Sequence, residues 1–197
     1  MKASIFVILI MVSSSASAAL SEPEFLATIQ RFETDSTVLA RKFFPRQEFI
    51  PVKPLWAAEL KDYPSGAMPT RGRREEAEIT IAGWVARLPS ANSDAIDFVF
   101  CHEVGHHVSR RLPTERTADD FAARECLPLL WGTGLTAKRI KAIADYSWDL
   151  RTYHRSQGGA NRPYDSSRCT VELIVRAGKG EVVNTEEMTT CDRGLGR

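Results

Sequence analysis

Residues 101–107 read Cys-His-Glu-Val-Gly-His-His, within a stretch from 94 to 110 whose apolar side chains favour a helix. Two histidines four positions apart lie one turn above the other on the same face of a helix. His102 and His106 are therefore predicted to point to one place, with Glu103 beside them. The chain has four histidines, and three of them lie within these residues.

This spacing is typical of a zinc site, since two imidazoles on one helical face can bind a tetrahedral metal and the glutamate between them can act on water. The sequence predicts one Zn²⁺ per chain, bound by His102 and His106, with Glu103 as the general base. One alternative stays open, in which the two histidines belong to the core and Glu103 lies on a solvated face. His107 lies one step off the metal face, and we expect it to pack or to hydrogen bond.

A second predicted helix, from about 115 to 130, carries two acids that complete this site. A short link makes the two helices antiparallel, so that Glu115 lies level with His106 and Asp119 level with His102. We expect Glu115 to be the third zinc ligand and Asp119 to accept the outer N–H of His102. If Glu115 only interacts with the helix dipole, Asp119 becomes the third ligand.

A third predicted helix, from 136 to about 154, offers donors for a reacting carbonyl oxygen. Tyr146, Tyr153 and His154 are the candidates for this oxyanion donor, and the sequence does not select one of them. His154 has a second interpretation as an ordinary residue at the C-terminal end of a helix.

The fold class predicted around these helices is α+β and mainly helical. Helical spacing of apolar residues extends over 22–44, and prolines make 45–77 irregular. Alternating polarity over 78–86 predicts a strand directly before the histidine helix. A further short strand is expected at 171–175. No internal repeat is present.

The first 18 residues have the layout of a secretory signal peptide: Lys2, an apolar run from 5 to 12, and small residues that end in Ala16-Ser17-Ala18. We expect an exported protein, periplasmic or secreted after cleavage near Ala18. The alternative is an uncleaved anchor. No second long apolar stretch follows, so no membrane span is expected in the mature chain.

Export changes the interpretation of the four cysteines, because disulfides are the default in an oxidising compartment. Three pairings of Cys101, Cys126, Cys169 and Cys191 exist. We favour Cys169–Cys191, which leaves Cys101–Cys126 to join the two metal helices. No CxxC spacing is present, so a structural zinc bound by cysteines is not expected.

Composition and charge narrow the function classes. The 197 residues are 43% hydrophobic, and 26 Lys+Arg stand against 25 Asp+Glu, which excludes a disordered chain and gives no support for nucleic-acid binding. The expected organisation is a signal peptide (1–18), an N-terminal helix with an irregular segment (19–77), a metallopeptidase-like core (78–155) and a cysteine-containing tail packed on that core (156–197). The oligomeric state is not specified by the sequence.

The stretch from about 79 to 128 resembles secreted bacterial zinc metallopeptidase-like proteins of the gluzincin type. The residues that carry the resemblance are Gly83–Pro89, Asp94-Ala95, Cys101–His107, Glu115–Asp119, Phe121–Ala123 and Cys126-Leu127. The resemblance implies a disulfide-stabilised, zincin-like domain in which an edge strand precedes the HExxH helix and a following Glu-x-x-Ala-Asp helix supplies the third ligand.

The function expected from these features is hydrolysis of a peptide or protein substrate by zinc-activated water, with Glu103 as the general base. The strand at 78–86 would present an exposed edge to which an extended peptide adds as a further strand. Two other classes stay open: a zinc-binding pseudo-peptidase without turnover, and a disulfide-stabilised binding or structural domain with incidental histidines.

Overall fold

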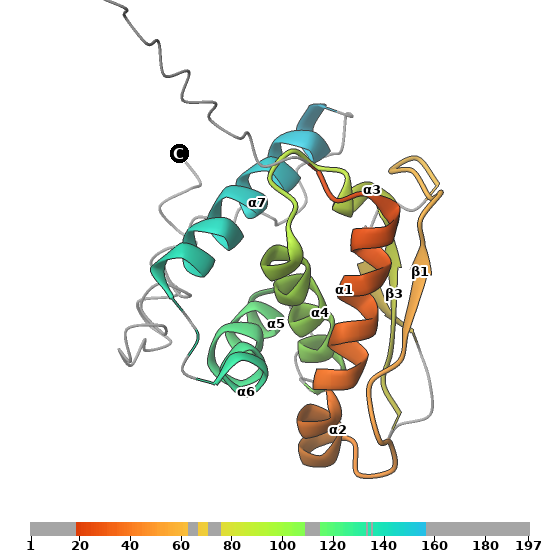
Figure 1. Cartoon of the computed structure of the whole chain (residues 1–197), viewed down its shortest axis with the longest axis vertical. Coiled ribbons are helices and arrows are strands. Elements are labelled where there is room, and N and C mark those ends of the chain that lie inside the picture. Colours follow the sequence, from red (N-terminus) through yellow and green to blue (C-terminus); the bar gives the residue numbers. More distant parts are fainter. Residues whose placement is uncertain are drawn as a thin grey trace, which may run out of the picture.

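The computed structural model describes residues 19–62, 67–70, 76–108, 115–132, 134 and 136–156. At positions 69, 70, 115, 116, 151, 154 and 155 only the backbone is described. The predicted signal peptide at 1–18 and the predicted strand at 171–175 lie outside these ranges. Helices lie beside a small three-stranded sheet (Figure 1), so the α+β, mainly helical fold class is confirmed.

The sheet has the order β1-β3-β2, with β1 at Val52–Leu55, β2 at Ala67–Thr70 and β3 at Glu78–Ala82. β3 is parallel to β1 and antiparallel to β2. The prediction of an edge strand at 78–86 is therefore wrong, because β3 is paired on both sides and ends at Ala82. The irregular segment predicted at 45–77 is also wrong in part, because it contains β1 and β2.

The strand β3 ends where the backbone of a neighbouring loop comes close. A Cβ on Gly83 would lie 2.0 Å from the carbonyl oxygen of Trp56, so only glycine fits there. The chain turns at this point into the short helix α3 at Gly83–Ala86, which is entirely buried. The Arg87 guanidinium donates to the same Trp56 carbonyl at 2.6 Å and holds the loop in place.

The N-terminal segment forms two helices where one was predicted, α1 at Glu22–Asp35 and α2 at Thr37–Phe43. The break lies at Ser36, whose buried hydroxyl donates to the Glu33 carbonyl and accepts from the Ile50 amide, each at 2.9 Å. A hydroxyl that satisfies backbone groups on both sides stabilises a turn against a continuous helix.

The histidine helix α4 extends over Ser93–Val108 and is the centre of the molecule. It contacts α1, α5 and α7 and the strands β2 and β3. Residues on all sides of its middle are buried, and Phe100 packs on Phe32 with ring centroids 4.4 Å apart. A helix surrounded in this way needs apolar residues on every face, which explains its weak amphipathicity.

The second predicted helix is one continuous helical stretch with a change of pitch. It begins as α5 at Glu115–Phe121, widens to the π-helical segment η1 at Ala122–Cys126, and ends as α6 at Leu127–Trp131. A disulfide joins Cys101 on α4 to Cys126 on η1, so this predicted pair is confirmed. Cys169 and Cys191 lie outside the described residues.

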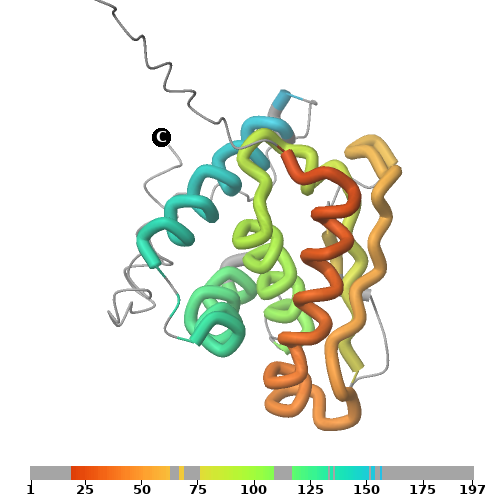
Figure 2. Tube along the Cα trace, viewed as in Figure 1, coloured from red at the N-terminus to blue at the C-terminus, as the bar shows by residue number. Residues whose placement is uncertain are grey.

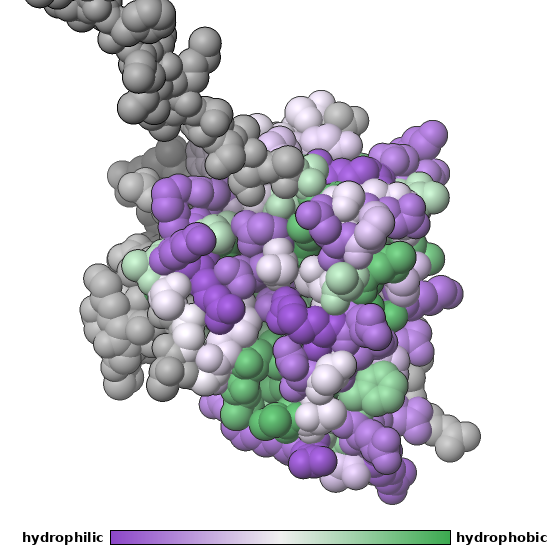
Figure 3. Space-filling model, in the orientation of Figure 1, coloured by the Kyte–Doolittle hydropathy of each residue, from purple (hydrophilic) through white to green (hydrophobic). Residues whose placement is uncertain are grey.

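The helix α7 at Ala137–Ser156 crosses beside α4 (Figure 2), held by Arg139–Asp94 at 3.3 Å and by the Ser90 amide on Asp149 at 3.0 Å. On the face in Figure 3, hydrophilic residues surround an apolar patch over α6, where Leu129 and Leu130 are only partly buried.

No helix in the described part of the chain is long and apolar enough to cross a membrane.

Candidate metal centre

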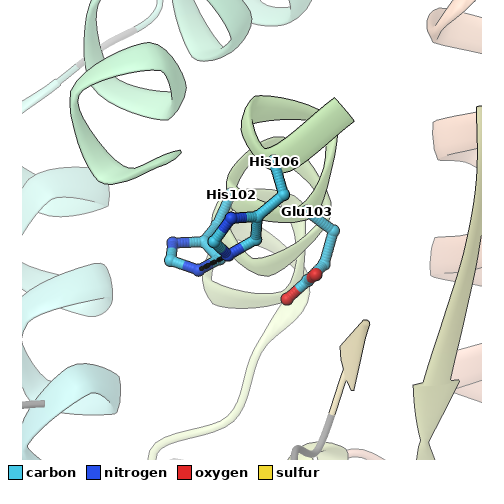
Figure 4. A group of neighbouring side chains, drawn as sticks. All are labelled: His102, Glu103 and His106. Atoms are coloured by element: carbon cyan, nitrogen blue, oxygen red, sulfur yellow. Dashed lines mark hydrogen bonds between the residues drawn. The ribbon is translucent and has the colours of Figure 1, made fainter. Parts of the chain in front are cut away.

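His102 and His106 project from the same face of α4 and meet at their tips. The two Nε2 atoms are 3.0 Å apart, with the rings edge to face and their centroids at 4.7 Å (Figure 4). This geometry follows from the i, i+4 spacing, since residues four apart are neighbours on a helix surface. Glu103 lies beside the pair, and the three side chains have ligand atoms all within 4.8 Å of one another.

The Asp119 carboxylate fixes the orientation of His102. Its Oδ1 lies 2.7 Å from Nδ1 of His102, across the interface between α4 and α5. A carboxylate at Nδ1 accepts the proton on that nitrogen, so in the neutral ring the lone pair of His102 is on Nε2 and faces His106. The predicted contact between these two residues is therefore present, and the role of Asp119 in metal binding stays a prediction.

The donor set of His102, Glu103 and His106 is compatible with a metal ion. Two nitrogens that bind one tetrahedral zinc at about 2.0–2.1 Å lie roughly 3.3–3.4 Å apart. The observed Nε2 separation of 3.0 Å requires a small outward movement of either ring. In the neutral tautomer that carries its proton on Nδ1, His102 presents at Nε2 the lone pair that a cation needs.

Glu103 is shielded from solvent although it carries a carboxylate. Only 6% of the residue is exposed, and its side chain lies beside the two histidines on α4. Burying a carboxylate costs free energy unless polar groups surround it. A buried carboxylate is therefore typical of a functional position. The placement agrees with a side chain that works on a molecule bound next to His102 and His106.

A close approach of two helices brings Asp119 within reach. A Cβ on Gly105 would lie 2.7 Å from Cα and 2.8 Å from the carbonyl oxygen of Ala118. Ala118 is fully buried at this crossing. Sequence reasoning missed both residues, although a glycine inside a helical pattern is the signal that indicates a close backbone contact.

His107 takes a different direction from the other two histidines. Its Nε2 lies 3.2 Å from the carbonyl oxygen of Glu78, and its ring packs edge-on against Phe44. His107 thus joins α4 to the start of β3. The prediction that it packs and hydrogen bonds is confirmed.

The predicted oxyanion donors all belong to α7. Tyr153 packs on Trp84, with ring centroids 5.5 Å apart. Tyr146 is buried, its hydroxyl has no hydrogen-bond partner among the described residues, and burial raises its pKa above the ordinary value. The side chain of His154 lies outside the described residues, and so does that of Glu115, whose backbone begins α5 one turn before Asp119.

Comparison of the chain with protein-family models, with curated proteins and with solved structures found no match.

Proposed function

We propose that this protein is an exported zinc-dependent metallopeptidase. The observation that carries the proposal is the meeting of the His102 and His106 Nε2 atoms at 3.0 Å with the Glu103 carboxylate beside them. This is the arrangement that metal-assisted hydrolysis of a peptide bond requires. The Cys101–Cys126 disulfide supports export, since disulfides persist in oxidising compartments.

The zinc ligands in this proposal are His102, His106 and Glu115, with one ion per chain. When bound, zinc polarises a carbonyl and lowers the pKa of water. Asp119 keeps the His102 ring in place through its contact at Nδ1. With the ring proton on Nδ1, the neutral imidazole presents its Nε2 lone pair to the ion.

Glu103 moves the proton in the reaction. Its carboxylate takes a proton from the attacking water and passes it to the nitrogen of the leaving amine. Its shielded position next to the two histidines keeps the carboxylate close to the reacting atoms. The oxyanion donor remains a proposal among Tyr146, Tyr153 and His154.

An extended peptide is the substrate class that this arrangement favours. β2 is an outer strand of the sheet, and it contacts α4, the helix that carries the histidines. A peptide that adds to the outer edge of β2 would run beside α4 as a further strand. β3 cannot take this part, because both of its edges are paired.

Replacement of Glu103 by Gln tests the proposal. Glu103→Gln keeps the shape of the side chain but removes the base, so turnover of a peptide library should fall by at least about 10²-fold. Zinc content, measured by elemental analysis after dialysis, should stay at one ion per chain. His107→Ala is the matched control on the same helix and should keep both the zinc and the turnover.

Three results would contradict this function. A purified protein without bound transition metal would exclude a metalloenzyme. Unchanged turnover in Glu103→Gln would exclude Glu103 as the base. Full zinc content without turnover of any library peptide would favour the non-catalytic zinc-binding alternative.

A further inference from the structure

We propose that the Cys101–Cys126 disulfide is a positioning element of the metal centre. It holds α4 against α5 and η1 in the arrangement that brings Asp119 to His102, and so increases the affinity for the metal. This inference rests on the zinc centre of the proposed function and extends it, because it assigns the disulfide a part in metal binding in addition to its part in the fold.

The disulfide closes a loop that contains the whole candidate centre. Cys101 and Cys126 are separated by 25 positions, and His102, His106, Glu103, Glu115 and Asp119 lie between them. Cross-linking the ends of a loop removes many of its conformations before any ligand binds. The metal ligands therefore start from a restricted set of arrangements, which lowers the entropy lost on binding.

The disulfide belongs to the same interface as the His102–Asp119 contact. Cys101 directly precedes His102 on α4, and Cys126 lies two helical turns after Asp119 on the continuous stretch of α5 and η1. On the other side of the His102–Asp119 contact from the disulfide, Gly105 and Ala118 bring the backbones together. The disulfide, the backbone contact and the 2.7 Å Nδ1–Oδ1 contact thus fix one interface.

The covalent bond matters because the Asp119 contact is sensitive to distance. The Oδ1–Nδ1 separation is 2.7 Å, and a lateral movement of α5 that increases it past about 3.5 Å ends the hydrogen bond. Helix-to-helix packing by apolar side chains tolerates shifts of that size more readily than a hydrogen bond does. The disulfide removes this freedom next to His102.

The geometry points to a permanent constraint, not to a redox switch. Both Cys101 and Cys126 are 0% exposed, so a reducing thiolate has no access to either sulfur in the folded protein. The disulfide therefore acts in every folded molecule that has passed through an oxidising compartment.

The first experiment measures zinc affinity without the disulfide. In Cys101→Ala/Cys126→Ala, chelator competition well below the melting temperature should give about 10–100-fold weaker zinc binding, the range for loss of groups that orient ligands. Cys101→Val/Cys126→Ala restores apolar volume and serves if the first pair does not fold. Neither variant contains thiols at these positions that could bind zinc themselves.

The control is a variant with a similar loss of melting temperature away from the interface. Phe25→Leu is suitable, because Phe25 is fully buried on α1 and packs on Trp56. It should bind zinc as the wild-type chain does. An equal loss of affinity in Phe25→Leu and in the cysteine variants would overturn the proposal, since it would reduce the effect to general destabilisation.

A double-mutant cycle with Asp119→Ala tests the route of the effect. If the disulfide acts by positioning Asp119, its removal in the Asp119→Ala background should change zinc affinity by no more than about twofold. A full, additive loss in that background would overturn the proposal. A wild-type chain that binds no zinc would overturn the proposed function as well, whereas tight binding by wild-type and cysteine-free chains alike would overturn this inference alone.

Discussion

His102 is held at both of its ring nitrogens. Nδ1 lies 2.7 Å from the Asp119 carboxylate and Nε2 lies 3.0 Å from the His106 ring, so rotation of the imidazole breaks two contacts at once. The orientation that presents the Nε2 lone pair is thus built into the protein before a cation arrives. We therefore expect zinc affinity to depend on Asp119 even though this residue is not assigned as a ligand.

Glu115 and Asp119 on α5 can be told apart by their effect on zinc binding. Glu115→Ala should abolish tight zinc binding, because it removes the proposed third ligand. Asp119→Asn should weaken binding by only about 10–100-fold, because the amide oxygen still accepts from His102 but carries no charge. Chelator competition measures both. If Asp119→Ala releases the metal and Glu115→Ala does not, the two assignments are reversed.

The candidate site was predictable from the sequence to the extent that helical spacing determines it. The i, i+4 rule places His102 beside His106, and the antiparallel register places Asp119 beside His102. Gly105 within a helical pattern is a signal of a close backbone contact, but its partner Ala118 was not predictable, because the hydrophobic pattern of either helix does not contain the distance between the two helices.

At the scale of elements, the interface between α4 and α5 depends on one glycine. Gly105→Ala should lower the melting temperature, although alanine is favoured over glycine in a helix by about 1 kcal/mol. The added Cβ would lie 2.7 Å from Cα of Ala118, and a backbone atom cannot yield as a flexible side chain does. Overpacking of this kind costs about 1–3 kcal/mol. Thermal unfolding followed by circular dichroism measures the net effect.

The position of the overlap provides a control for that prediction. Because the added Cβ would meet Cα and the carbonyl of Ala118, Ala118→Gly should not rescue Gly105→Ala. A melting temperature of Gly105→Ala at or above that of the wild-type chain would show that α5 moves away easily. The contact between α4 and α5 at Gly105 and Ala118 would then not be rigid.

The sheet shows what the sequence pattern could not provide. β1 and β2 are four residues long and each contains a proline, a residue that argues against a strand interior. Their hydrogen bonds are made with β3, whose own alternating pattern was recognised. The alternating polarity of β3 does not show how many strands pair with it. For this reason a central strand was predicted as an edge strand.

At the scale of the whole molecule, one buried carboxylate joins three helices. Asp97 on α4 accepts from the Arg31 guanidinium of α1 at 2.7 Å and from Trp131 Nε1 of α6 at 2.9 Å. Its side chain is 1% exposed, and Arg31 is 66 positions away in sequence. The hydrophobic periodicity of α4 gives no sign of this contact, because a charged residue on a helix normally indicates the solvated face.

This carboxylate gives the free energy of unfolding a defined dependence on pH. Burial raises the pKa of Asp97 above the ordinary value of 3.8, and the Arg31 and Trp131 contacts oppose that rise without cancelling it, while Asp94 adds to it. Between 3.8 and the higher pKa of the folded state, the folded protein retains a proton that the unfolded chain has released. Stability from this group is therefore present at low pH and lost as the pH rises through that window.

Comparison with Asp97→Asn isolates this effect, because the amide keeps the shape and one acceptor oxygen but does not titrate. Urea unfolding of both proteins from below pH 3.8 to neutrality should show the wild-type chain losing free energy of unfolding relative to Asp97→Asn as the pH rises. Asp97→Ala should be the least stable of the three at every pH, since it leaves Trp131 Nε1 without its acceptor. A wild-type chain that gains stability over Asp97→Asn with rising pH would mean that the Arg31 ion pair outweighs burial, and that this buried carboxylate stabilises the three-helix contact in its charged form.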